Sequence, residues 1–90
     1  ESAAAGRQAR LAQRRPLVKE TARLEKLMTD LGSERDELDR RLGDAAFYAS
    51  AAPAAVQAAS RRCAEVVGEL AAAEERWLEV QAELEAIGEP

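Results

Sequence analysis

The sequence predicts an all-α fold, an antiparallel two-helix coiled-coil hairpin preceded by a basic N-terminal linker. Composition supports this fold, because only 3% of the 90 residues are aromatic while 33% are charged. Ala, Leu, Glu and Arg dominate the chain, as they do in long helices and coiled coils. No stretch alternates apolar and polar residues for long enough to predict a strand.

Two apolar seams with heptad spacing lie in the sequence. We interpret residues 1–15 as a basic linker, partly helical or disordered, and residues 16–90 as the hairpin. Helix one is expected at about 17–43, a break at 44–52 and helix two at about 53–87. In the break, Phe47 and Tyr48 are expected to close the open end of the hairpin.

The predicted core consists of seam residues from both helices. On helix one these are Leu17, Leu24, Leu31 and Leu38, and on helix two Val56, Cys63, Leu70 and Trp77. In an antiparallel pair the residue numbers of facing positions add up to a constant. Two values of this sum, 94 and 101, place the middle of the hairpin near the break. The sum of 94 pairs Leu17 with Trp77, Leu24 with Leu70, Leu31 with Cys63 and Leu38 with Val56.

Charge distinguishes these two registers. The sum of 94 brings Glu20 beside Arg76 and Glu34 beside Arg62, two attractive pairs. The sum of 101 would instead bring Glu20 beside Glu83, a repulsive pair. We therefore predict the register with the sum of 94.

Basic residues are concentrated near the N-terminus. Residues 1–26 carry seven basic and three acidic side chains, whereas residues 27–90 carry six basic and fourteen acidic ones. The seven cations are Arg7, Arg10, Arg14, Arg15, Lys19, Arg23 and Lys26. Repeated cations are what phosphate binding requires, so these residues are the candidate nucleic-acid-binding site. The alternative is that they solubilise the linker and pair with glutamates of helix two.

Enzymatic chemistry has no residues to support it in this sequence. There is no His and only one Cys, which argues against histidine-based catalysis and against a zinc site. The glycines are isolated, so no phosphate-binding loop is predicted. We expect no catalytic residue, no metal and no cofactor.

The sequence also bears on where the protein is located and on whether the chain is part of a longer protein. No apolar run approaches the roughly 20 residues of a membrane span, so no membrane partner is expected. The single Cys63 cannot form an internal disulfide, and a cytoplasmic location is the default. Because the chain lacks an initial Met, we interpret it as part of a longer protein.

Three stretches carry a family resemblance: PLVKETARLEKLM at 16–28, RLGDAAFY at 41–48 and ERWLEVQAELEAI at 75–87. Together they resemble the C-terminal extension of bacterial ABC-F ATPases, of the YheS type and more distantly of the Uup type. The resemblance implies a parent with two ATP-binding cassettes, related to ribosome-associated translation factors. In Uup-like members this extension is regarded as a DNA-binding coiled coil.

Carried over by position, Arg14, Arg15 and Lys19 match the basic entry to the first helix of that family. Two positions depart from the Uup pattern, with Val18 where an aromatic residue is frequent and Ala45 where Pro is frequent. We expect a non-catalytic arm that contacts nucleic acid, either ribosomal RNA or DNA, or the ribosome, with ATP bound only in the parent's cassettes. The alternative is a purely structural or dimerising spacer, in which apolar surface left over by the hairpin supports self-association.

Overall fold

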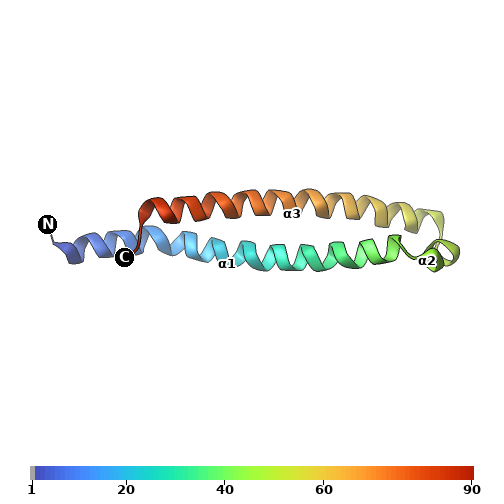
Figure 1. The fold of residues 1–90 in the computed structure, drawn as a ribbon, viewed down its shortest axis with the longest axis horizontal. Coiled ribbons are helices and arrows are strands. Elements are labelled where there is room, and N and C mark those ends of the chain that lie inside the picture. Colours follow the sequence, from blue (N-terminus) through green and yellow to red (C-terminus); the bar gives the residue numbers. More distant parts are fainter. Residues whose placement is uncertain (1) are drawn as a thin grey trace.

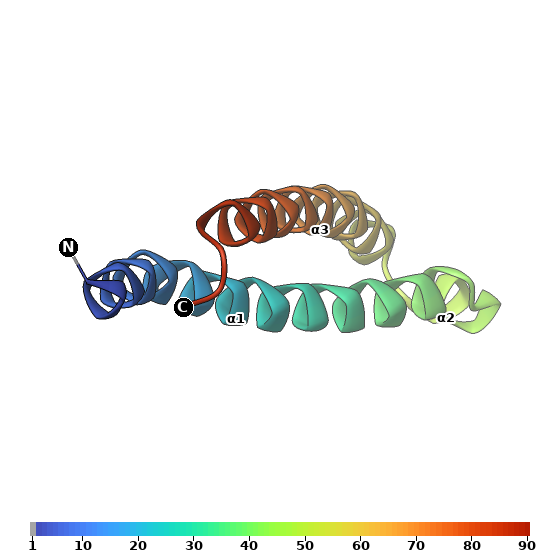
Figure 2. The same cartoon turned by 60° about the vertical axis from the view of Figure 1, so that its left-hand side comes forward.

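The computed structural model describes residues 2–90, in which three helices follow one another along the chain. Helices α1 (Ala3–Leu42) and α3 (Pro53–Ile87) run antiparallel, and the short α2 (Ala45–Ser50) joins them at one end (Figures 1 and 2). The molecule is a rod of 71 × 15 × 14 Å. The prediction of an all-α two-helix hairpin is confirmed.

Helix α1 is longer than the sequence pattern suggested. It begins at Ala3, where the hydroxyl of Ser2 accepts a hydrogen bond from the Ala5 amide at 3.1 Å. Residues 3–15, interpreted from the sequence as a basic linker that is partly helical or disordered, are helical and continuous with the expected helix one. Ala, Gln and Arg have high helix propensity, and the helix continues through Pro16 although proline cannot donate the usual backbone bond. The first turns of α1 extend past the end of α3 (Figure 1).

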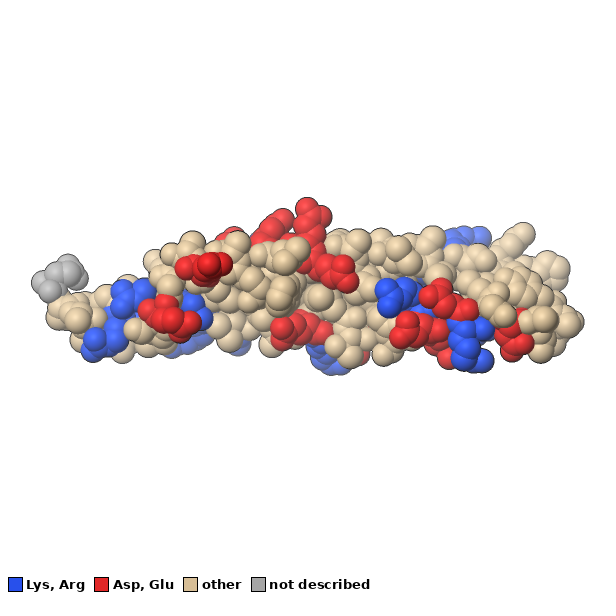
Figure 3. All heavy atoms as spheres, in the orientation of Figure 1, with Lys and Arg blue, Asp and Glu red and all other residues tan. Residues whose placement is uncertain are grey.

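The break between the long helices contains the short helix α2. Asp44 caps it, because the carboxylate accepts a hydrogen bond from the Ala46 amide at 2.9 Å. Residues 45–60 include no charged side chain, and this end of the rod is uncharged in the space-filling view (Figure 3). Helix α3 then starts at Pro53, whose fixed φ suits the first position of a helix.

The core is a single row of contacts between α1 and α3. Its buried side chains are Leu24, Leu31, Leu38, Ala59, Val66, Leu70, Ala73, Val80 and Leu84. Of the eight residues predicted for the core, Leu24, Leu31, Leu38 and Leu70 are buried, and Leu17, Val56, Cys63 and Trp77 are half-buried. Four of the six buried side chains of α3 are Ala or Val, and their small size lets the two helices lie close together.

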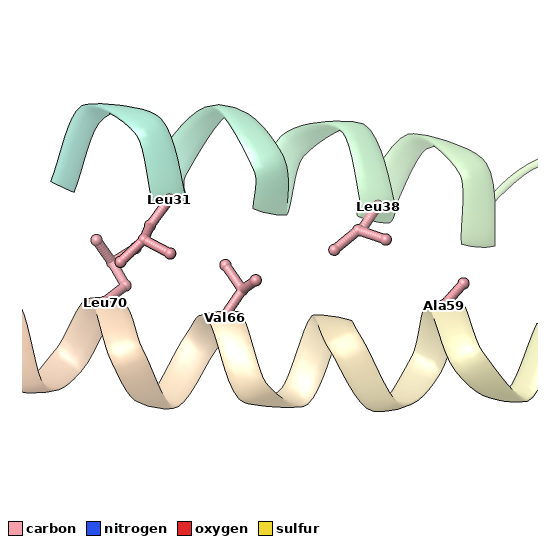
Figure 4. Close-up of a cluster of buried hydrophobic side chains, with 5 residues drawn as sticks. All are labelled: Leu31, Leu38, Ala59, Val66 and Leu70. Atoms are coloured by element: carbon pink, nitrogen blue, oxygen red, sulfur yellow. The ribbon is translucent and has the colours of Figure 1, made fainter. Parts of the chain in front are cut away.

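The core pairing follows the sum of 101, so the predicted register is wrong by one heptad. Leu24 and Leu70, which the sum of 94 would pair, lie in separate core clusters. Leu17 and Leu84, which add up to 101, lie in the same cluster. Leu31 instead lies beside Leu70 in the close-up of the core (Figure 4).

Two hydrogen bonds between the helices agree with this register. The indole Nε1 of Trp77 donates to the Glu25 carboxylate at 3.1 Å, next to Leu24 in the sequence. The thiol of Cys63 donates to the Asp39 carboxylate at 3.4 Å, next to Leu38. Trp77 therefore lies near Leu24 rather than near Leu17.

The physical reason for the shift is the match of apolar residues at the ends of the hairpin. In the predicted register Leu84 would face Arg10, whereas in the observed one it packs in the cluster that includes Leu17. Burying a leucine contributes on the order of 1.5–3 kcal/mol, and an exposed ion pair contributes a few tenths. Apolar packing therefore outweighs the charge signs on which the register prediction relied.

The repulsion between Glu20 and Glu83 that was expected for the register with the sum of 101 is also absent, because an arginine lies between them. Arg76 contacts Glu20 at 2.8 Å and Glu83 at 3.7 Å, so one guanidinium lies between the two carboxylates. Arg62 in the same way contacts Glu34 at 2.6 Å and Glu69 at 3.4 Å. The attractive pairs predicted for the sum of 94 thus form in the other register, because the arginine side chain is long enough to reach them.

Candidate nucleic-acid interface

The structure divides the seven candidate cations into three groups. Arg10 and Arg14 face the end of α3, and Arg23 and Lys26 pair with carboxylates on α1 itself. Arg7, Arg15 and Lys19 form the third group, whose side chains point to solvent. The predicted site is therefore not one surface, although all its members lie on the same helix.

Arg14 caps the C-terminus of α3. Its guanidinium donates to the carbonyl oxygens of Leu84 at 3.2 Å and Gly88 at 3.0 Å, and Arg10 donates to the carbonyl of Glu89 at 3.0 Å. The last carbonyls of a helix lack partners within the helix and carry its negative dipole end, so a cation there is stabilising. This role of Arg14 could not be predicted from the sequence, because the position of the end of α3 depends on the register.

Arg23 and Lys26 are engaged in ion pairs on the surface of α1. Lys26 contacts Asp30 at 2.9 Å one turn further on, and Arg23 contacts Glu20 at 3.6 Å. Both cations are exposed, so these pairs contribute a few tenths of a kcal/mol and can exchange for another anion.

Arg7, Arg15 and Lys19 form no ion pair or side-chain hydrogen bond with any residue in the range 2–90. They span twelve residues of α1, or about 18 Å at 1.5 Å per residue. Basic side chains follow the N-terminal half of α1 in the space-filling view, while α3 beside it carries acidic ones (Figure 3). We call these three residues the free basic face.

Apolar side chains interrupt the free basic face. Leu11 is 37% exposed and Val18 is 51% exposed, and with Arg15 and Lys19 they line a shallow hollow of about 260 Å³. Leu11 and Val18 were not predicted as functional residues from the sequence. Their seven-residue spacing outside the core seam is the signal that could have identified them.

Two glutamates of α1 have lowered pKa values because each is hydrogen-bonded to an arginine of α3. The hydrogen bond from Arg76 lowers the pKa of Glu20, and that from Arg62 lowers the pKa of Glu34. The same contacts raise the pKa of both arginines. Arg62 and Arg76 are therefore occupied by carboxylates and are poor candidates for phosphate contacts.

The end of the hairpin at α2 carries the two aromatic residues expected to close it. Phe47 packs against the core cluster around Leu38, and the Arg41 guanidinium lies 5.9 Å from the centre of its ring. Tyr48 contacts Phe47 edge-on at 5.8 Å between ring centres and is 50% exposed. Phe47 thus takes the expected position, while Tyr48 presents half of its surface to solvent.

Two further features bear on chemistry within the described range. Burial raises the pKa of the Cys63 thiol, which keeps it protonated. Residues 2–90 contain no group of three or more side chains suited to hold a metal ion.

None of the helices described combines the length and the apolar composition that crossing a membrane requires.

The fold and its surface define a helical hairpin with one basic and one acidic arm. Residues 13–82 match the family described as the ABC transporter C-terminal domain, and the chain belongs to that family. The matched range covers both long helices from just before Pro16 to the last turns of α3. No match was found among curated proteins or among solved structures.

Proposed function

We propose that this chain is the C-terminal arm of an ABC-F ATPase and that its free basic face contacts nucleic acid, either ribosomal RNA or DNA. The parent would bind ATP in cassettes outside this segment and act in the cytoplasm, and the arm itself would catalyse nothing. Membership in the ABC transporter C-terminal domain family supports the accessory role. The subtype rests on the resemblance of residues 16–28, 41–48 and 75–87.

The observation that best supports contact with nucleic acid is the free basic face itself. Three cations lie along about 18 Å of one helix and have no partner within residues 2–90. Each phosphate that such a cation neutralises releases a counterion, which favours binding and makes it depend on salt. The opposing acidic helix would orient the arm, because it is repelled by the same phosphates.

A pair of matched triple variants tests this proposal. Arg7→Gln, Arg15→Gln and Lys19→Gln remove the free basic face, and Arg40→Gln, Arg41→Gln and Arg61→Gln remove the same charge near the other end. Fluorescence anisotropy against duplex DNA and against a structured ribosomal RNA fragment, each over a salt series, measures both affinity and slope. We expect the first triple to weaken binding at least tenfold and to flatten the slope by about one unit per lost contact.

The control triple should change binding by much less. If both triples weaken binding equally, only net charge matters and the site is wrong. If the unchanged chain binds neither nucleic acid at low salt, the arm is a structural spacer, the competing function. The ratio of DNA to RNA affinity decides which nucleic acid is the target.

A further inference from the structure

The shallow hollow beside the free basic face combines apolar and cationic side chains, all of them from α1. Its lining residues are Leu11, Arg14, Arg15, Val18 and Lys19. We call it the Leu11 hollow. Among residues 2–90 no carboxylate lines it, since Glu85 and Glu89 belong to a separate hollow that shares only Arg14 with it. The lining therefore suits a ligand that offers both negative charge and an apolar surface.

The two apolar residues of the Leu11 hollow are not used by the fold. Leu11 and Val18 are exposed, and neither packs in a core cluster. They are seven residues apart and so lie on the same side of α1, about 10 Å from each other. Their contact with water is unfavourable, and an apolar ligand surface placed over both of them would remove it.

The cations of the Leu11 hollow differ in how they are held. Arg14 is fixed by its hydrogen bonds to the carbonyl oxygens of Leu84 and Gly88. Arg15 and Lys19 have no side-chain partner within residues 2–90 and can turn toward a ligand. Unpaired bases stack on guanidinium planes as well as on aromatic rings, and phosphates pair with any of these cations.

We propose that the Leu11 hollow receives the base of an unpaired nucleotide, so that the free basic face prefers loops, bulges or single strands to a continuous duplex. This inference rests on the proposed contact with nucleic acid and names the part that is recognised. The base packs on Leu11 and Val18, and the phosphates on its two sides meet Arg15 and Lys19. The volume of about 260 Å³ is smaller than the roughly 300–1,000 Å³ of sites for drug-sized ligands, which suits a single base.

The geometry of the hairpin argues against a continuous duplex at this hollow. Arg14 marks the end of α3, and Leu11 lies about one turn before it and Val18 about one turn after it. The hollow therefore extends into the part of the rod where two helices lie side by side, about 20 Å across. The major groove of DNA is about 12 Å wide, and that of duplex RNA is narrower still. Paired bases thus cannot reach both apolar residues, whereas an unpaired base can.

An acidic amphipathic helix of a protein offers similar chemistry but fits less well. Such a helix lies along its partner over several turns and needs apolar contacts at each of them. The next residue of α1 at the same spacing after Leu11 and Val18 is Glu25, whose carboxylate accepts a hydrogen bond from Trp77. The apolar strip is therefore limited to two residues, enough for one base and too short for a helix.

Three fluorescein-labelled probes of the same sequence test the preference: a continuous duplex, a duplex in which one strand carries an extra unpaired nucleotide, and the single strand. Each is made as DNA and as RNA, and binding to the 90-residue chain is measured by anisotropy. We expect the two probes with unpaired nucleotides to bind about tenfold more tightly than the continuous duplex. Equal binding of all three would overturn the proposal, while the contact with nucleic acid itself would stand.

A matched pair of double variants locates the base. Leu11→Ser with Val18→Ser removes one leucine and one valine from the hollow. Leu78→Ser with Val67→Ser removes the same two residue types from exposed positions of α3, and circular dichroism checks that both variants keep their helix content. We expect only the first to lose the preference for unpaired nucleotides, with its duplex affinity and salt slope unchanged because its charges are unchanged. A preference that persists in the first variant, or that is lost equally in both, would contradict the assignment.

A probe with 2-aminopurine at the unpaired position reports on the base without any substitution in the protein. Its fluorescence should change when the unchanged chain binds, and no change would overturn the proposal. If no nucleic-acid probe binds at low salt, the proposed function itself fails. Binding of an acidic amphipathic peptide that is lost in Leu11→Ser with Val18→Ser, without any preference for unpaired nucleotides, would assign the hollow to a protein helix instead.

Discussion

Arg14 and Arg15 are neighbours with the same side chain and different surroundings. Successive residues on a helix point about 100° apart, so Arg14 turns toward α3 and Arg15 turns toward solvent. Arg14 donates two hydrogen bonds to carbonyls at the end of α3, and Arg15 has no side-chain partner within residues 2–90. One arginine therefore serves stability, and the other is available to a ligand.

Replacing each of them by alanine separates these roles. Arg14→Ala removes two charge-assisted hydrogen bonds from the end of α3 and should lower the free energy of unfolding by about 1–2 kcal/mol. Arg15→Ala should change it by less than about 0.5 kcal/mol, as an exposed substitution. Urea denaturation measures the difference, and hydrogen exchange should show faster exchange in the last turn of α3 only for Arg14→Ala. Equal destabilisation by the two variants would contradict the capping role.

At the scale of the elements, α1 and α3 are joined by one apolar row with arginine-centred ion pairs along its side. The pKa values of Glu20 and Glu34 are lowered in the folded chain by Arg76 and Arg62. Stability from these pairs is present above the ordinary glutamate pKa of 4.5 and is lost as pH falls through the lower folded values. The ion pairs therefore stabilise the hairpin near neutral pH and not in acid.

The double variant Glu20→Gln with Glu34→Gln tests this dependence. Its melting temperature should be below that of the unchanged chain at pH 7, and the difference should shrink as pH falls below 4.5. Glu74→Gln with Glu75→Gln measures the effect of removing two carboxylates elsewhere on α3. A difference that stays constant from pH 7 to pH 3 in thermal melts would show that the pairs add nothing.

Disulfide trapping tests the register of the two helices. Leu38→Cys should form a disulfide with the native Cys63, because Cys63 donates a hydrogen bond to Asp39, the neighbour of Leu38. Leu31→Cys, which the other register would bring opposite Cys63, should form it much more slowly. Non-reducing gel electrophoresis after mild oxidation reports both, and the reverse order would restore the sum of 94.

At the scale of the whole molecule, length is the dominant property. The radius of gyration is 20.2 Å, compared with about 12 Å for a compact domain of this size. Of residues 2–90, nine are buried, so most of the described chain is surface. The rod separates a basic half of α1 from the end at α2, where residues 45–60 carry no charge.

Small-angle X-ray scattering should therefore give a radius of gyration close to 20 Å that is independent of concentration. Side-by-side association would increase the cross-section and the apparent mass as concentration rises. A value near that of a compact domain would mean that the hairpin folds back on itself in solution.

The heptad spacing by itself determined that the chain forms two long helices that fold into a hairpin, since the period of the apolar residues matches the turn of a helix. The start of α3 at Pro53 and the closing position of Phe47 were also predictable from local signals. The basic residues of the candidate site could be identified by composition. Composition could not show which of these basic residues remain free to bind a ligand.

Only the tertiary structure decided the register and what depends on it. The sums 94 and 101 differ by seven, one heptad, so the same residues face inward in both and the period cannot distinguish them. The outcome depends on which layers match along the whole length, with Leu84 packed in the cluster of Leu17 instead of facing Arg10. That choice places the end of α3 beside Arg14. It also lets long arginine side chains bridge carboxylates that local charge counting treats as repelling.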